Sequence, residues 1–233
     1  MRNLILPVLL ILGLSSCSTF QYLTVDSSQL QKDDQKQLTT ENDTMRLTYG
    51  FSGGGGPVTI TVFNKTNQPM FINWAKSAII RDGQSFSLYG ANSAFVGSAT
   101  PTGTGTADLT GTVSVPPGME FIPPQTKITR STVYLNQTGG STQTIMPDTA
   151  KKQRYTLPDG AIESYFLVSY NEAQSPVRWK SYLTFAIGSG SGTEFTVSHT
   201  FYIGTVMETH YAPAMFKLYQ EPGDQFYVFW QKN

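Results

Sequence analysis

Alternation of apolar and hydroxyl side chains is the feature that most constrains this chain. In the segment Val58–Val62, valine and isoleucine alternate with threonine. The segment 195–207 repeats the pattern, with Phe201 and Ile203 on the apolar side and Thr200 opposite. Successive side chains of a strand point to opposite faces, so this spacing predicts half-buried antiparallel strands.

Two further apolar faces are predicted in this way. In the segment 162–169, Ile162, Phe166 and Val168 are expected on one face, with Glu163 opposite. Met207 is expected on the same face as Phe201 and Ile203.

Glycine and proline mark the breaks between these segments. Gly53–Pro57 separates the segment 45–51 from 58–63, and Gly188–Gly192 is expected to form a hairpin between 182–187 and 195–207. Short strands with turns at such spacing predict an all-β protein, an antiparallel β-sandwich of immunoglobulin-like or related type with roughly ten to twelve strands. We expect a single domain over residues 19–233.

Three stretches interrupt this rhythm. Residues 97–111 and 136–153 are polar or rich in small residues and are expected to form long loops. Residues 26–37 fit either a flexible tether or part of the fold. The preceding segment 19–25 holds two aromatic residues and a Leu-Val pair, which favours a first strand.

The beginning of the chain has the pattern of an export signal. Arg2 is followed by an apolar run over residues 4–12, which is too short to span a bilayer as a helix. One interpretation is an ordinary secretory signal peptide that has a cysteine near its cleavage site. However, Leu14-Ser15-Ser16-Cys17 resembles the bacterial lipobox, in which the cysteine is acylated. Since Cys17 is the only cysteine of the chain, we expect residues 1–16 to be a cleaved signal peptide and residues 17–18 the lipid anchor.

Composition argues against several classes of function. The 16 basic and 16 acidic residues balance, and no basic patch of the kind that nucleic-acid binding needs is present. No serine lies in a nucleophile elbow, and no glycine run precedes a helix as a phosphate loop does. We therefore expect no nucleic-acid partner, no cofactor and no catalytic site, although carboxylates for a glycosidase pair are present in number.

The histidines give little support for a metal site. His199 falls on the apolar side of the segment 195–207 and is expected to be a core or edge residue. Glu208 and His210 share the opposite side, so the three side chains cannot converge within one flat strand. No metal site is predicted.

Aromatic residues are the better indication of a binding surface. Trp74, Trp179 and Trp230 could stack on a sugar if they were exposed on a sheet face. The alternative is that they fill the core, as aromatic residues in strands usually do.

Several segments together resemble a group of Bacteroidetes lipoproteins. They are Glu41–Thr44, Tyr49–Phe51 with the glycine run, Val62–Thr66, Ile72–Ser77 and Ile122–Thr126. The resemblance covers mainly residues 17–130 and implies an envelope lipoprotein with a β-sandwich body, without an assigned activity.

The same resemblance implies a modification and an orientation. Asp43-Thr44-Met45 and Asp148-Thr149-Ala150 are similar to the O-glycosylation motif of that phylum, which makes Thr44 and Thr149 candidate sites. Residues 18–22 lack the acidic residues that surface-exported lipoproteins carry behind the cysteine. This favours the outer membrane, facing the periplasm.

Together these observations predict a non-catalytic envelope lipoprotein. We expect it to be held at the membrane through lipid on Cys17 and to bind or scaffold another envelope component. The alternative is a glycan-binding lipoprotein that uses exposed aromatic residues.

Overall fold

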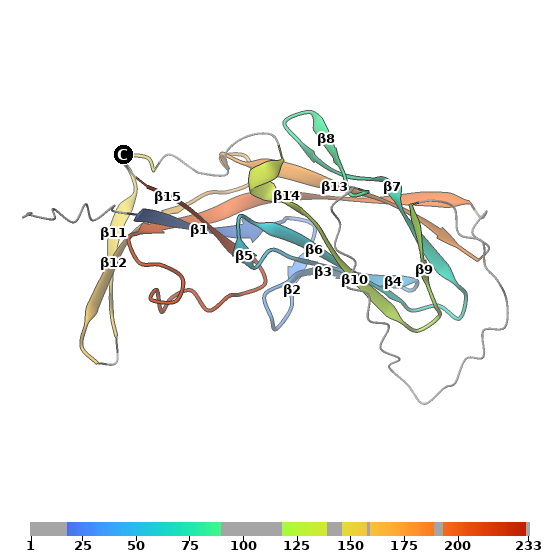
Figure 1. The fold of residues 1–233 in the computed structure, drawn as a ribbon, viewed down its shortest axis with the longest axis horizontal. Coiled ribbons are helices and arrows are strands. Elements are labelled where there is room, and N and C mark those ends of the chain that lie inside the picture. Colours follow the sequence, from blue (N-terminus) through green and yellow to red (C-terminus); the bar gives the residue numbers. More distant parts are fainter. Residues whose placement is uncertain (1–17, 90–117, 139–145, 158, 189–192, 232–233) are drawn as a thin grey trace, which may run out of the picture.

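In the computed structural model, residues 18–89, 118–138, 146–157, 159–188 and 193–231 are described. The expected signal peptide, Cys17 and the expected loop 97–111 lie outside them. The described residues form fifteen strands and one short 3-10 helix, η1 (Leu135–Gln137), and they contain no α-helix (Figure 1). Among them, no helix is long and apolar enough to cross a membrane.

The strands form two sheets, in which every pairing except that of β15 with β5 is antiparallel. The larger sheet runs β5-β15-β1-β14-β13-β7-β8, with β9 beside β7 and the β11–β12 hairpin beside β14. Its strands are β1 (Ser18–Asp26), β5 (Gly53–Gly54), β7 (Met70–Arg81), β8 (Gln84–Ser87), β9 (Met119–Ile122), β11 (Lys151–Thr156), β12 (Ile162–Ser169), β13 (Arg178–Ile187), β14 (Glu194–Thr209) and β15 (Gln225–Gln231).

The smaller sheet has the order β10-β6-β4-β3-β2. Its strands are β2 (Gln31–Lys32), β3 (Leu38–Glu41), β4 (Met45–Gly50), β6 (Pro57–Asn64) and β10 (Lys127–Tyr134). The all-β prediction is confirmed. The expected strand number was too low, because two-residue strands such as β2 and β5 are too short to show a period in the sequence.

Buried apolar side chains of both sheets belong to one core. Val58, Ile60 and Val62 of β6 point into it while their threonine neighbours point outward, as the alternation predicts. The hairpin expected around Gly188 is also confirmed, since Ala186 of β13 pairs with Glu194 of β14.

A second apolar cluster covers the other face of the larger sheet at β1. Tyr22 of β1 packs there against Phe216 and Tyr219 from the segment after β14, and its hydroxyl donates to the carbonyl of Tyr211 at 2.8 Å. β1 therefore has buried side chains on both faces, and the segment 19–25 is a strand within the sheet.

Residues 26–37 are part of the fold. Lys32 of β2 bridges Asp26 at 2.6 Å and Asp224 at 2.7 Å, which links the smaller sheet to the ends of β1 and β15. Burial lowers the pKa of Lys32, but the hydrogen bonds that its ammonium group donates to these two carboxylates outweigh it, so the pKa is raised overall. The tether alternative is therefore wrong for this segment.

In β14, the alternation of core-facing and outward-facing side chains shifts by one residue at Gly204. Thr24 of β1 pairs with Thr205 and Val25 pairs with Ile203, so Gly204 is the extra residue of a β-bulge. Beyond it Val206 faces the main core, whereas Met207 packs with the second cluster. The expectation that Met207 shares the face of Phe201 is wrong for this reason.

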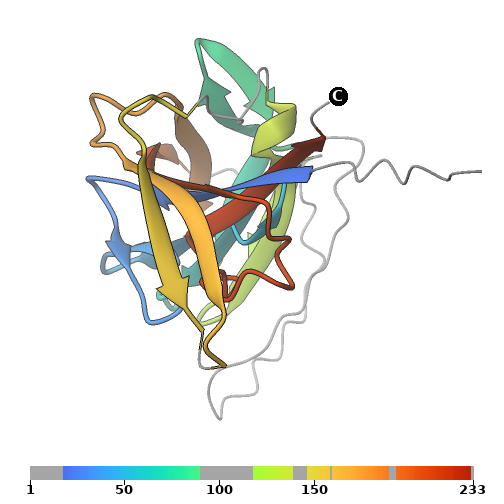
Figure 2. The ribbon, with the colours of Figure 1, turned by 90° about the vertical axis from the view of Figure 1, so that its left-hand side faces the viewer.

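The apolar side of β12 also differs from the expectation. Glu163 is buried, with 4% of its surface exposed, while Ile162 and Phe166 are 59% and 44% exposed. The β11–β12 hairpin lies at the end of the larger sheet (Figure 2), and β11 takes in Lys151–Gln153 from the stretch expected as a loop.

Candidate functional site: the outer face of the smaller sheet

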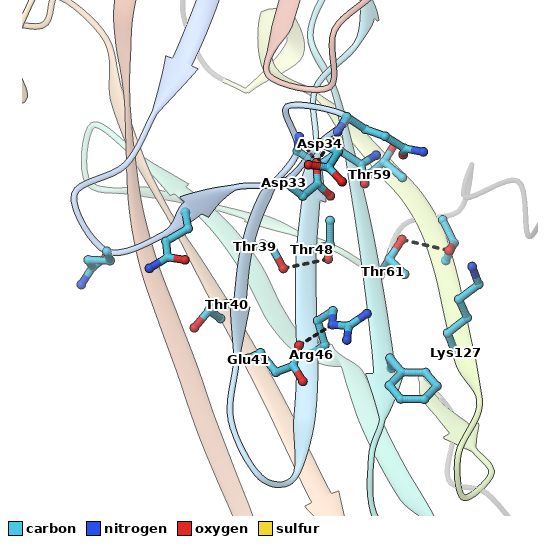
Figure 3. Close-up of a pocket in the computed structure, with 16 residues that line it drawn as sticks. Asp33, Asp34, Thr39, Thr40, Glu41, Arg46, Thr48, Thr59, Thr61 and Lys127 are labelled. Atoms are coloured by element: carbon cyan, nitrogen blue, oxygen red, sulfur yellow. Dashed lines mark hydrogen bonds and ion pairs between the residues drawn. The ribbon is translucent and has the colours of Figure 1, made fainter. Parts of the chain in front are cut away.

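The outward face of the smaller sheet is hollowed. The hollow has a volume of about 1170 Å³ and is bordered by the turn after β2 at one end and by charged side chains at the other (Figure 3). It lies over β3, β4, β6 and β10, whose opposite faces carry the apolar side chains of the core.

Strand register sorts the outward side chains into rows. The central row is made of four threonines on four neighbouring strands, because Thr39 pairs with Thr48, Thr48 with Thr61, and Thr61 with Thr129. Neighbouring strands lie about 4.8 Å apart, so the row crosses four of the five strands of the sheet at a regular spacing.

The hydroxyl groups of this face bond to one another in pairs. Thr39 and Thr48 are joined by a 3.2 Å hydrogen bond between their hydroxyls, and Thr61 and Thr129 by one of 2.9 Å. Thr59 and Ser131 form a third pair at 2.6 Å. These bonds hold the side chains in one orientation, and each hydroxyl has two acceptor lone pairs, so further hydrogen bonds can be accepted.

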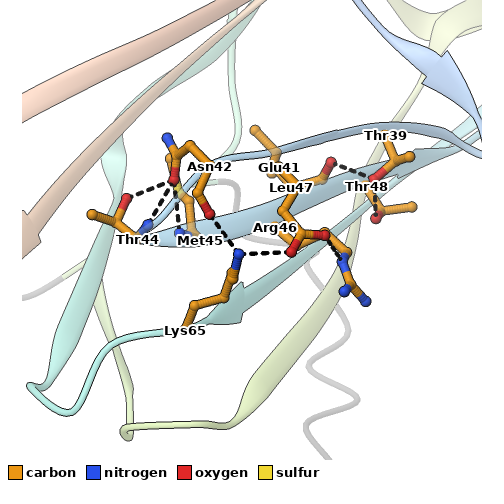
Figure 4. Close-up of polar contacts among 9 residues, drawn as sticks. All are labelled: Thr39, Glu41, Asn42, Thr44, Met45, Arg46, Leu47, Thr48 and Lys65. Atoms are coloured by element: carbon orange, nitrogen blue, oxygen red, sulfur yellow. Dashed lines mark hydrogen bonds and ion pairs between the residues drawn. The ribbon is translucent and has the colours of Figure 1, made fainter.

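A row of charged and aromatic residues closes one end. Arg46 donates to Glu41 at 2.5 Å and lies 5.9 Å from the ring centre of Phe63, and Lys65 contacts Glu41 at 2.7 Å (Figure 4). Lys127 pairs with Phe63 in the register. The hydrogen bonds from Arg46 and Lys65 lower the pKa of Glu41 to about 2, so this carboxylate is charged at neutral pH.

The turn after β2 borders the opposite end. The carboxylate of Asp33 accepts hydrogen bonds from the backbone N–H groups of Gln35 and Gln37 at 2.9 and 2.8 Å. Lys36 in this turn has a φ of 62°, and Asp34 lines the hollow beside it. The hollow thus combines hydroxyls, amides, both signs of charge and one aromatic ring, a set suited to a polar ligand.

Two of the three tryptophans lie in the core and do not reach this face. Trp74 is 1% exposed, donates to Glu120 at 2.6 Å and lies under the guanidinium of Arg130. Trp179 is 2% exposed and stacks on Phe201. Neither side chain can offer a face to a sugar; Trp230, on β15, is half-buried.

The candidate glycosylation sites lie in turns. Thr44 is the last residue of the turn between β3 and β4, and its hydroxyl donates to the side-chain oxygen of Asn42 at 2.8 Å. Thr149 is exposed in the turn Pro147–Ala150, which is closed by a 2.9 Å backbone hydrogen bond.

The histidines are held apart by the fold. His199 lies at the inner side of β14, where its Nδ1 is 3.1 Å from the Tyr49 hydroxyl. Glu208 instead accepts from Gln21 at 2.8 Å, and Nδ1 of His210 lies 3.3 Å from the carbonyl of Ser18. The described part of the chain brings no three metal-ligating side chains together.

Burial of His199 predicts a specific dependence of stability on pH. Burial lowers the pKa of His199, so on acidification the unfolded chain takes up this proton first. The free energy of unfolding should therefore fall as the pH drops below about 6.5, the ordinary value, and this loss should end below the pKa of the folded state.

Urea denaturation of the wild type and of His199→Gln measures this effect. The variant should lose less stability than the wild type between about pH 7 and pH 5, and above about pH 8 the two slopes should agree because the imidazole is neutral in both states. Equal slopes over the acid range would contradict the interpretation.

The sequence analysis did not predict the hollow as a binding site, although the alternating threonines that line it are visible in the sequence. The threonines of Val58–Val62 were expected on a solvated face, but their alignment with Thr48 and Thr129 depends on pairing between distant segments.

Comparison with known proteins adds no relative: no family model, no curated protein and no solved structure matches the chain.

Proposed function

We propose that this chain is a non-catalytic lipoprotein of the bacterial envelope that binds or scaffolds another envelope component. Lipid on Cys17 would hold it at a membrane, in the manner of the Bacteroidetes lipoproteins that it resembles. The body would be a β-sandwich of immunoglobulin-like or related type. The shared core of the two sheets supports this arrangement, and the outer membrane facing the periplasm is the proposed location.

The hollow of the smaller sheet is the observation that carries the binding role. Its side chains come from five strands and the turn after β2, and the hydroxyl pairs fix their orientation before any ligand arrives. A pre-oriented surface loses little conformational entropy on binding. Reversible protein interfaces are, taken as a whole, about as polar as the rest of a protein surface, so the polarity of this face is compatible with a protein partner.

Filling the hollow should abolish partner binding. Thr61 points outward at its centre, so Thr61→Trp occupies the space while leaving the core side of β6 intact. The matched control is Thr196→Trp, at an exposed position of β14 in the other sheet.

The three proteins are purified in parallel from detergent-solubilised membranes. A partner should be recovered in stoichiometric amount with the wild type and Thr196→Trp, and be lost with Thr61→Trp. Recovery of all three proteins alone, or of the same partner with all three, would contradict the proposal.

Glycan binding is the second candidate, now on different residues. The hydroxyls and amides that line the hollow, together with the Phe63 ring at one end of it, provide the hydrogen bonds and the apolar contact that a sugar needs. Affinity electrophoresis through gels that contain neutral or acidic polysaccharides tests it. Retardation of the wild type that is lost in Thr61→Trp would favour a glycan over a protein.

A further inference from the structure

We propose that one end of the larger sheet, the end at which β1 begins, rests on an anionic phospholipid surface. This membrane-contacting edge is formed by β11, β12 and the end of β15. This inference rests on the proposed lipid anchor. It adds a second, non-covalent contact that would orient the body on the bilayer.

Exposed apolar side chains gather at this end. Phe229 of β15 is 62% exposed and stacks on Phe20 of β1 with ring centres 5.7 Å apart. Ile162 and Phe166 of β12 and Tyr155 of β11 are also exposed. Four of the eight large apolar side chains that the described residues expose therefore lie on these three strands.

The position of β1 places this edge next to the anchor. Ser18 opens β1 and directly follows Cys17 in the chain. Thr19 pairs with Trp230, and Phe20 pairs with Phe229. At about 3.3 Å per residue along a strand and about 4.8 Å between strands, the Cα atoms of Trp230 and Phe229 lie roughly 6 and 8 Å from that of Ser18.

That distance matches the membrane interface. The headgroup layer of a bilayer is roughly 5–7 Å thick on each side of the hydrocarbon. With acyl chains on Cys17 inserted, Trp230 and Phe229 would stand at or just above this layer, which is where aromatic side chains are enriched in membrane proteins. Within the described structure, Phe229 is left 62% exposed.

Basic residues on β11 suit an anionic surface. Lys151, Lys152 and Arg154 are all exposed, and no ion pair joins them to a carboxylate within the part of the chain that the structure describes. β11 pairs with β12, so the basic side chains and the apolar residues Ile162 and Phe166 lie on one hairpin (Figures 1 and 2). Charges of this kind attract anionic headgroups while apolar side chains enter the interface.

Trp230 provides a direct measurement of the contact. Full-length lipidated protein is reconstituted into vesicles of zwitterionic and anionic phospholipid that carry bromine on their acyl chains, and tryptophan quenching is recorded. Trp74 and Trp179 are buried in the core, so the quenched emission should come from Trp230 and disappear in Trp230→Phe.

Variants of the edge should weaken this quenching. Phe229→Ser removes the most exposed ring, and the triple change of Lys151, Lys152 and Arg154 to Gln removes the charges. Each basic side chain near an anionic surface contributes roughly fivefold to the contact equilibrium. The triple variant should therefore lose quenching in anionic vesicles. Tyr89→Ser, at an exposed aromatic near the opposite edge of the sheet, is the matched control and should quench like the wild type.

Flotation of the same vesicles separates the two proposals. If the protein floats with the vesicles but Trp230 is not quenched, the proposed membrane contact of the edge is overturned, while the lipid anchor is still supported. Protein that does not float overturns both. Protein that floats unquenched and cross-links to a second copy through β12 or β15 assigns the edge to self-association, and so overturns the membrane contact.

Discussion

Replacing Cys17 by Ser should move this protein from the membrane fraction to the soluble fraction almost completely. Transfer of acyl chains into a bilayer contributes about 0.8 kcal/mol per buried methylene, and two chains hold a protein stably where one does not. No helix of the described residues could span a membrane in their place. The expected effect is therefore close to all-or-none.

Ultracentrifugation of cell lysates, together with metabolic labelling by a fatty acid, measures this change. Ser18→Ala alters the neighbouring side chain and keeps the thiol, so it should remain labelled and sediment with membranes. Cys17→Ser protein that still sediments in full, or wild-type protein that takes up no label, would contradict the anchor.

Trp179→Ala should cause the largest loss of stability among single changes in the body. The Trp179 ring stacks on Phe201 with centres 5.8 Å apart and meets Phe51 edge-on at the same distance. These three rings join β13 and β14 to the segment after β4, so the substitution opens a cavity between the two sheets. Large-to-small changes of buried aromatic residues cost about 3–5 kcal/mol.

Urea denaturation followed by circular dichroism tests this expectation. Tyr182→Ala is the matched control, because Tyr182 lies on the same strand but is 40% exposed. Its cost should stay near the roughly 0.5 kcal/mol typical of surface substitutions. Similar losses for the two variants would contradict the role given to Trp179 in the core.

Local pattern was sufficient for several features of the fold. The alternation in Val58–Val62 predicted both the strand and its buried face, and the glycine run before Pro57 predicted the break between β4 and β6. Aromatic content predicted that the segment 19–25 is a strand. Each of these features is determined by residues that are close together in the chain, so it can be predicted from a single sequence.

Other features depended on contacts between distant segments. At the bulge in the pairing of β14 with β1, Gly204 lies against the Asp26 carboxylate, where a Cβ atom would overlap it, so this contact between distant segments requires glycine. Burial of Glu163 and exposure of Ile162 follow from where the β11–β12 hairpin lies, and alternation alone cannot say which face of an end hairpin is covered.

The sequence by itself determined an all-β chain, the positions of several strands and of the breaks between them, and the expectation of a lipid anchor at Cys17. Only the tertiary structure decided that Thr39, Thr48, Thr61 and Thr129 form one row, and that Trp74 and Trp179 are enclosed while Phe229 is not. The physical reason is that period and turn chemistry act within a few residues. Strand register is set by which distant strands pair. Burial of a sheet face is set by whether another layer packs against it.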